Sequence, residues 1–231
     1  MYGTRYLTGG HAELVPACCA LLLGLLMLVS GAREVSAQED THSMILVAKP
    51  ALSDPNFART VVLVTRHGRA GTVGIILNRP TDATLAHMFP ENKLFEKSTD
   101  PVYQGGPVAL RTPVFLFRSS TPVNNALHLF ADVYLSADLS VLTNIYQHTS
   151  GTNDLRVFAG HAGWYPGQLR QEIIRGDWHI TEADTATVFH ADAETLWPRF
   201  ITLFNNEVVQ AVRSYKQPPH YFRFVVDTAD R

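Results

Sequence analysis

The sequence predicts a single domain of mixed strands and helices behind an apolar N-terminal leader, and three observations support this prediction. β-Branched and apolar runs, such as residues 60–65, recur between residues with turn chemistry. Segments with helix caps and helical spacing of apolar residues come between and after these runs. No linker-like change of composition divides residues 44–213. The chain has 231 residues, of which 46% are hydrophobic, so it can bury one sizeable core.

The leader has the layout of a secretory signal peptide. Residues 14–32 carry no charge and are rich in leucine, and a small-x-small pattern follows at residues 35–37. We therefore expect residues 1–37 to be removed and the protein to be exported to the periplasm or cell envelope. Two alternatives stay open: an uncleaved membrane anchor, since about 20 apolar residues span a bilayer, and translation from Met44, which would leave a cytoplasmic protein. The remaining divisions are a linker at 38–43, the domain at 44–213 and a C-terminal tail at 214–231.

Composition excludes several kinds of site. Cys18 and Cys19 both lie in the leader, so the mature chain has no cysteine for a disulfide, a nucleophile or a metal site. The net charge is −2 and no basic block occurs, which argues against direct binding to nucleic acid. The histidines lack metal-ligand spacing, and the glycine-rich nucleotide motifs are missing, so we predict no metal and no cofactor.

Short apolar runs that end at residues with turn chemistry predict the strands. Residues 60–65 and 72–78 form a pair around a hairpin turn at 67–71. Before them, Asp54 makes an Asx turn and Phe57 returns that loop to the core. The other predicted strands are 44–48, 102–104, 114–118, 126–135, 155–159 and 178–181, with a last strand or ordered tail at 221–227.

Capping residues and the spacing of apolar side chains predict the helices. Ser136 is the expected N-cap of a helix over 137–148. Gly176 ends another helix over 168–175, because glycine is a usual C-cap residue. Pro198 either kinks the long C-terminal helix or begins its main part. The remaining helical segments are a short helix at 85–89, a helical turn after Asp184 and the long helix at 192–213.

Residues 160–167 contain three glycines, a proline and a tryptophan, which predicts a rigid turn pinned into the core by Trp164. If Gly163 has a positive φ, a Gly163→Val substitution should destabilise the protein strongly. Gly105 and Gly106 form a second glycine-rich segment after a short strand. Such a run indicates close contact between backbones or a sharp corner.

Four motifs together resemble the AlgH/YqgE family of small bacterial proteins, and the resemblance covers about residues 44–205. The motifs are Asp54-Pro55-Asn56-Phe57, Asn78-Arg79-Pro80, Gly105-Gly106-Pro107-Val108, and a longer one with Gly160, Gly163, Trp164, Pro166, Gly167, Gln168 and Glu172. The resemblance implies an α+β fold with a branched, partly barrel-like antiparallel β-sheet and flanking helices. It also implies a regulatory role, because family members are named as regulators of exopolysaccharide production. The resemblance identifies no catalytic residue.

Two features depart from the family pattern. The leader is unlike the usual short cytoplasmic start, which weakens the case for direct action at DNA. In the first hairpin, Arg66 precedes His67 where relatives tend to carry an acidic residue. A charge-dependent role in that hairpin is therefore not carried over to this chain.

Arg79 and His161 are the candidate ligand-binding residues, because each lies near a glycine-rich segment whose backbone N–H groups could bind a small anion. The alternative is that the glycines only permit tight corners. His67 and His161 are also the histidines best placed for acid-base or metal chemistry, against the simpler interpretation as ordinary turn residues.

Three hypotheses about function follow. The first is a non-enzymatic binding or regulatory protein, exported, whose partner is a protein or a small anionic ligand. The second is a small-ligand enzyme or hydrolase that uses a cleft between the glycine-rich turns, with His67, His161, Asp54 and Glu172 as its candidate groups. It requires these side chains to converge. The third is a cytoplasmic transcriptional regulator that begins at Met44.

Overall fold

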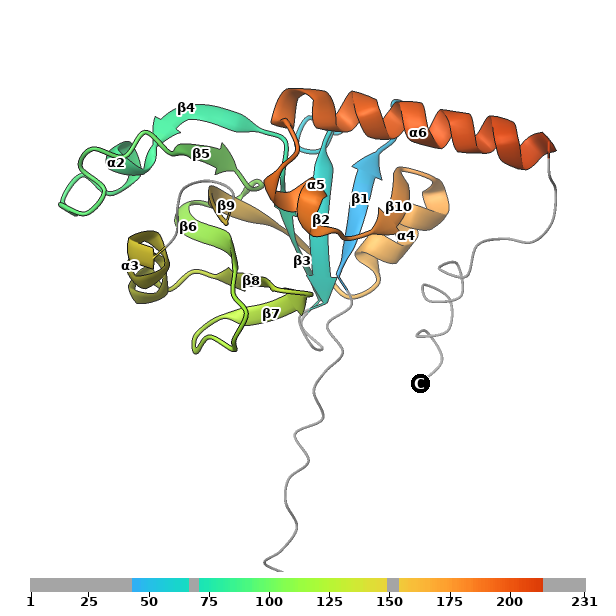
Figure 1. Cartoon of the computed structure of the whole chain (residues 1–231). Coiled ribbons are helices and arrows are strands. Elements are labelled where there is room, and N and C mark those ends of the chain that lie inside the picture. Colours follow the sequence, from blue (N-terminus) through green and yellow to red (C-terminus); the bar gives the residue numbers. More distant parts are fainter. Residues whose placement is uncertain (1–42, 67–70, 149–153, 214–231) are drawn as a thin grey trace, which may run out of the picture. The chain divides into compact units, whose positions relative to one another are not determined.

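The structure of the protein, a computed structural model, describes residues 43–66, 71–148 and 154–213. Within these ranges a ten-stranded sheet curls into a half-barrel with helices on both sides of it (Figure 1). This confirms the predicted α+β fold. The leader, the hairpin turn with His67 and the segment 221–227 lie outside the described residues. No helix in the described ranges combines the length and the hydrophobicity needed to cross a membrane.

The strands and helices have the following bounds. The strands are β1 (Met44–Ala48), β2 (Val61–Arg66), β3 (Thr72–Ile76), β4 (Pro80–Thr84), β5 (Pro101–Gln104), β6 (Val108–Arg118), β7 (Leu127–Phe130), β8 (Val133–Ser136), β9 (Leu155–Trp164) and β10 (Trp178–Glu182). The helices are α2 (Leu85–Met88), α3 (Leu139–His148), α4 (Gln168–Arg175), α5 (Thr185–Phe189) and α6 (Ala193–Arg213).

The sheet runs in the order β10-β1-β2-β3-β9-β6-β8-β7, and each of these neighbouring pairs is antiparallel. It branches at β9. The first half of this strand pairs with β5 in parallel, through Val157 and Ala159. The second half pairs with β3 in antiparallel fashion, through Ala162 and Trp164. The branched sheet implied by the family resemblance is therefore confirmed, and β9 is its central strand.

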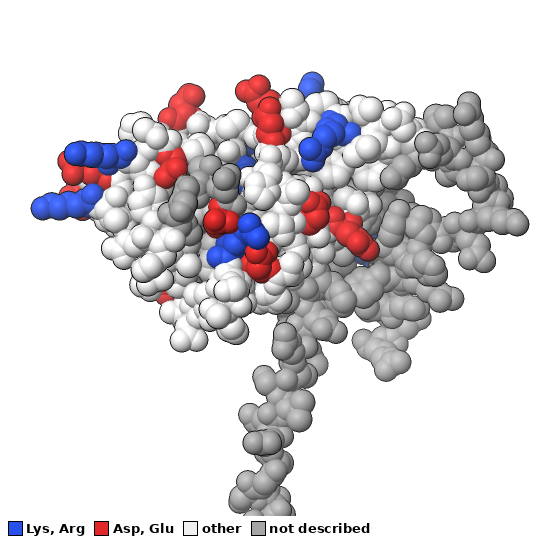
Figure 2. Space-filling model, viewed as in Figure 1, with Lys and Arg blue, Asp and Glu red and all other residues white. Residues whose placement is uncertain are grey.

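Charges of both signs are interspersed on the face in view, with no patch of a single sign (Figure 2). Arg118 is one example of local neutralisation. Its guanidinium lies 2.7 Å from a carboxylate oxygen of Asp132 and 3.1 Å from one of Asp154. These three side chains are partly exposed, so the pairs orient the ends of strands more than they stabilise the fold.

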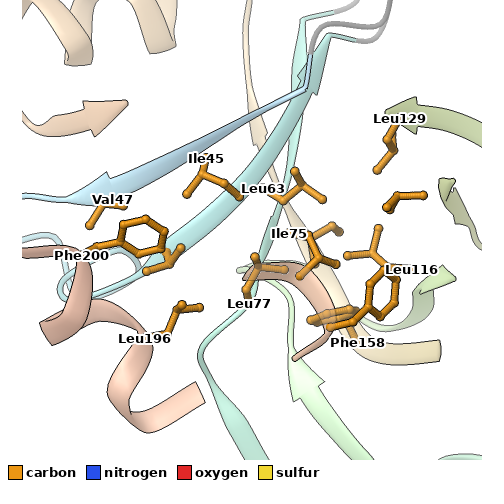
Figure 3. Close-up of a cluster of buried hydrophobic side chains, with 14 residues drawn as sticks. Ile45, Val47, Leu63, Ile75, Leu77, Leu116, Leu129, Phe158, Leu196 and Phe200 are labelled. Carbon is orange, nitrogen blue, oxygen red and sulfur yellow. The ribbon is translucent and has the colours of Figure 1, made fainter. Parts of the chain in front are cut away.

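The inner face of the half-barrel holds the largest apolar cluster (Figure 3). Ile45, Leu63 and Ile75 come from neighbouring strands and meet Phe158 of β9. Helices α5 and α6 close one end of this interior. Their contribution consists of Val188, Phe189, Leu196 and Phe200.

The opposite face of β1 and β2 is buried as well, which explains their continuous apolar sequences. Leu46 and Val62 alternate with the inward residues and pack against Trp164, Trp178 and Leu169 beneath α4. A strand buried on both faces has no polar side to show in its sequence. A third cluster packs α3 against β6 and β9, with Phe115, Phe117, Leu142 and Val157 among its members.

Four strand predictions were wrong in detail. Residues 160–164 continue β9, so the predicted rigid turn is confined to residues 165–167. β6 begins at Val108, ahead of the predicted 114, because an irregular register between Val108 and Pro113 lets the proline sit in the strand. The segment 126–135 is a hairpin of β7 and β8 that turns at Ala131 (φ 44°), without a glycine to signal it. The predicted strand 72–78 ends at Ile76, and no strand was predicted at Pro80–Thr84, where β4 lies.

The predicted helices agree with the structure more closely than the predicted strands do. Gly176 ends α4 in the left-handed region (φ 91°), and Asp184 caps α5 by accepting a hydrogen bond from the Thr187 N–H at 2.8 Å. The start of α3 differs, because Asp138 accepts from the N–H of Ser140 at 2.8 Å. Ser136, the expected cap, instead accepts from the N–H of Asp138. Pro198 lies inside α6.

Candidate functional site

The two glycine-rich segments meet at the branch of the sheet. Gly105 donates its N–H to the Ala159 carbonyl at 2.9 Å, and its own carbonyl accepts from the Ile76 N–H at 2.8 Å. It thus joins β3, β5 and β9 at one point. A Cβ atom on Gly105 would collide with the carbonyl oxygen of Gly160.

Gly106 and Gly160 lie at the same point, where the two glycine-rich segments cross. A Cβ on Gly106 would meet the backbone of His161, and one on Gly160 (φ 73°) would lie 2.6 Å from the Val108 oxygen. These glycines therefore allow backbones to approach closely, as the corner interpretation predicted. The N–H of Gly105 is engaged in the sheet, which removes it from the anion-binding nest considered above.

Gly163 differs from its neighbours. It is not among the residues with positive φ, and a Cβ built on it would have no atom within 4 Å. The premise of the Gly163→Val prediction is therefore wrong, because this residue lies in a regular strand and faces outward.

Trp164 anchors the end of β9 in an aromatic cluster. It is 3% exposed, stacks on Phe57 with ring centroids 5.4 Å apart, and meets Trp178 edge to face at 6.4 Å. Glu172 of α4 accepts hydrogen bonds from both indole N–H groups, at 2.9 Å from Trp164 and 3.1 Å from Trp178. Gln168 donates to its other carboxylate oxygen at 3.1 Å. Glu172 was a candidate group of the enzyme hypothesis, and the structure shows that it holds two tryptophans together.

A second corner contains the motifs around Asp54 and Asn78. Asp54 accepts from the Asn56 N–H at 2.8 Å, which confirms the Asx turn. Asn78 accepts from the Val61 N–H at 2.7 Å, and Arg79 donates to the Pro55 carbonyl at 3.0 Å. Burial lowers the pKa of Arg79, and the negative charge of Asp54 opposes that shift. Arg79 therefore holds the loop that contains Pro55. Pro80 follows it as the first residue of β4.

His161 lines a surface pocket of ≈ 380 Å³ beside the branch of the sheet. Val108 is its partner across the β6–β9 ladder, and Tyr165 stands beside it with 83% of its surface exposed. The lining consists of Gly71, Thr72, Val73, Val108, His161, Gly163, Trp164 and Tyr165. Arg79 is not part of this lining, so the two candidate ligand-binding residues do not meet in this pocket.

Three of the four groups of the enzyme hypothesis lie in the described part of the chain, and Asp54 and Glu172 do not converge on His161. Asp54 and Glu172 are each engaged in the structural contacts described above, and neither lines the pocket of His161. His67 lies outside the described residues. In the described part of the chain, no group of three or more His, Cys, Asp or Glu residues is arranged to hold a metal ion.

Arg156 was missed by the sequence reasoning. It is 5% exposed and donates to the carbonyls of Leu77 at 2.8 Å and Val188 at 2.6 Å, with its guanidinium 4.1 Å from the ring centroid of Tyr103. Burial lowers its pKa, and Tyr103 opposes the shift. The available signal was an arginine inside the otherwise apolar strand at 155–159, which indicates a charge carried into the core.

An α+β half-barrel whose sheet branches where two glycine-rich segments cross defines the class of this protein. Residues 45–209 match the AlgH-like family, and the chain belongs to that family. A UPF0301 protein of Streptomyces avermitilis is 34% identical over 196 residues, which cover 83% of this chain and 98% of that protein. A UPF0301 protein of a Marinomonas species is 35% identical over 153 residues, covering 64% of this chain and 81% of that one.

Solved structures show the same fold. The crystal structure of protein DIP2367 from Corynebacterium diphtheriae has a TM-score of 0.58 at 29% identity, over 70% of this chain and 86% of that one. The solution structure of the AlgH protein from Pseudomonas aeruginosa has a TM-score of 0.58 at 26% identity, over 77% and 94% of the two chains.

Proposed function

We propose that this AlgH-like protein is a non-enzymatic binding protein that acts at the cell envelope and docks a protein partner. The docking surface is the His161 face, defined as Val108, Leu110, His161 and Tyr165. The observation that carries the proposal is the position of Tyr165, an 83% exposed aromatic side chain directly after a buried tryptophan.

The His161 face combines exposed apolar side chains with a rigid support. Val108, the cross-strand partner of His161, is 44% exposed, and Leu110, two residues further along β6, is 51% exposed. The backbone below Tyr165 is fixed, because Trp164 is locked in the aromatic cluster and the Tyr165 N–H donates to Gln168 at 3.2 Å. Exposed aromatic residues on rigid supports lose little entropy on binding and are typical of protein interfaces.

A protein fits this face better than a small anion does. With Arg79 in the Asp54 corner, His161 is the one residue in the described lining of the pocket that can carry a positive charge. The pocket is rimmed instead by apolar groups, which a protein side chain can cover. This proposal keeps the regulatory role implied by the family resemblance as an effect of docking.

The leader supports export. Direct regulation at DNA would require a cytoplasmic start and a basic face, and the face shown in Figure 2 carries mixed charges. Fusing the first 45 residues to alkaline phosphatase tests export directly. We expect phosphatase activity outside the cytoplasmic membrane. An inactive fusion would favour the cytoplasmic regulator.

Site-specific photo-crosslinking in intact cells tests docking at the His161 face. A benzophenone amino acid is placed at Tyr165 and, as a control, at Ile174, a 68% exposed residue of α4. We expect one discrete protein adduct from position 165 that is weakened by Leu110→Ser, and none from position 174. Equal adducts from both positions, or none from position 165, would contradict the proposal.

A further inference from the structure

A second cavity opens at the end of the half-barrel away from α6, where the C-terminal end of β2 points in Figure 1. Its volume is ≈ 500 Å³, which is in the range of small-molecule sites. The side chains around it come from β2, β3, β6 and the β7–β8 hairpin. They are Thr65, Val73, Val114, Asn125, Ala126, Leu127, Leu135, Ser136 and Ala137.

This cavity is the open mouth of the barrel interior. In a strand, residues two apart face the same side. Thr65 therefore continues the inward row of Leu63, and Val114 continues that of Leu116. The same holds for Leu127 beside Leu129. The other end of the interior is closed by α5 and α6, so a molecule that enters at the mouth meets the packed core as its floor.

Thr65 is the unusual residue in this mouth. It is 3% exposed, and its hydroxyl is the one buried side-chain polar atom among the described residues that has no hydrogen-bond partner. The other hydroxyl of the lining is satisfied, since Ser136 donates to the Asn125 carbonyl at 2.6 Å. The Asn125 amide in turn donates to Asp138 at 2.8 Å. Leaving a buried hydroxyl unpaired is destabilising, and such a group needs an explanation.

We propose that the barrel mouth binds an uncharged, mainly apolar small molecule through one hydroxyl or carbonyl group that pairs with the Thr65 hydroxyl. The described lining contains aliphatic side chains and no charged residue, so a charged ligand would lose its hydration without a partner. The cavity shares Val73 with the pocket of His161 but includes none of the residues that define the His161 face, and this inference does not depend on the proposed function.

Three probes of one size test the ligand class on the full chain: 4-methylphenol, toluene and 4-methylbenzoate. Binding is followed by amide chemical shifts of β2, β6 and β7 in heteronuclear NMR titrations. We expect 4-methylphenol to bind at the mouth about tenfold more tightly than toluene, because it supplies the missing hydrogen-bond partner. We expect 4-methylbenzoate to give no shifts there.

Two matched variants test the role of the hydroxyl. Thr65→Val should erase the preference for 4-methylphenol over toluene and raise the unfolding midpoint of the free protein by about 2–4 °C. The control is Thr60→Val, at a fully buried residue whose hydroxyl donates to the Phe57 carbonyl at 2.7 Å. It should lower the midpoint and leave the probe preference unchanged.

Each result of the titrations and variants either supports or overturns the inference. Shifts at the mouth with 4-methylphenol favoured, and the preference lost only in Thr65→Val, support the inference. Failure of all three probes to shift these amides overturns it. Equal binding of 4-methylbenzoate would overturn the ligand class. A Thr65→Val variant that keeps the preference would remove Thr65 from the site.

Discussion

Trp164 and Tyr165 are neighbours with opposite roles, and the contrast shows how single residues divide the work at the end of β9. The indole of Trp164 is enclosed by Phe57, Trp178 and the carboxylate of Glu172. The ring of Tyr165 points into solvent beside the pocket. Because Trp164 is fixed, Tyr165 is presented from a rigid backbone.

Trp164→Ala should therefore lower the free energy of unfolding by about 3–5 kcal/mol, since it removes a buried aromatic side chain and leaves Glu172 with one indole partner fewer. Urea unfolding followed by circular dichroism measures this. Tyr165→Ala is the matched control and should change the free energy by less than about 0.5 kcal/mol. A similar loss in both variants would mean that Trp164 is not the anchor.

His179 makes stability depend on pH. Burial, and to a smaller extent the positive charge of Lys49, lower the pKa of His179, whose ring stacks on Phe204 at 4.4 Å. The unfolded chain then takes up this proton more readily than the folded protein. The stabilising contribution is complete above the unfolded pKa of about 6.5 and is lost as the pH falls through the lower folded value.

We therefore expect the unfolding midpoint to fall on going from pH 7.5 to pH 5.5, and to fall less in His179→Gln. Thermal unfolding at a series of pH values measures the difference. His190→Gln, at an exposed residue, should keep the wild-type slope. If the two variants have the same slope, the titration belongs to another group.

At the scale of elements, Arg156 connects the sheet to the helix that closes the barrel. Its guanidinium bonds the carbonyl of Leu77 after β3 and that of Val188 in α5. Arg156→Met should destabilise the protein by about 2–4 kcal/mol, because two buried carbonyls lose their donor. It should also speed hydrogen exchange of the α5 amides more than that of β2.

The control for that substitution is Arg175→Met. Arg175 is paired with Asp177 at a side chain that is 63% exposed, so its loss should leave the stability nearly unchanged. Uniform acceleration of exchange across β2 and α5 in Arg156→Met would contradict a specific role in holding the helix.

The elements that could be predicted from sequence are those with local signals. β2 and β3 have β-branched runs, and α4 ends at a glycine in the expected left-handed conformation. The hairpin at Ala131 was missed because no glycine or proline marks it. The strand predicted at 155–159 ended before Gly160, because a glycine is compatible both with a turn and with a crowded strand. Which of the two it forms depends on segments that are distant in the sequence.

The candidate site was predicted only in part, for the same reason. His161 does line a pocket, whereas Arg79, a candidate because it lies near a glycine-rich segment, lies in the Asp54 corner. The orphan hydroxyl of Thr65 has no local signature, and the one signal for Arg156, an arginine inside an apolar run, was not used. Both follow from which faces of the strands turn inward when the sheet curls.

The architecture of the whole molecule depends on the close crossing of two backbone segments at the branch of the sheet. Gly105 and Gly160 leave no room for a side chain where β3, β5 and β9 converge, while Gly163, three residues further along β9, is free of neighbours. The branch lies beside the His161 pocket, and Val73 of that pocket also lines the mouth of the barrel interior.

The most direct test compares Gly105→Ala with Gly163→Ala by urea unfolding of the full chain. Gly105 does not have a positive φ, so its substitution adds a steric conflict at the branch and no backbone strain. We expect a loss of about 3 kcal/mol or more for Gly105→Ala and a change within about 0.5 kcal/mol for Gly163→Ala. Equal stability of the two variants would contradict this expectation.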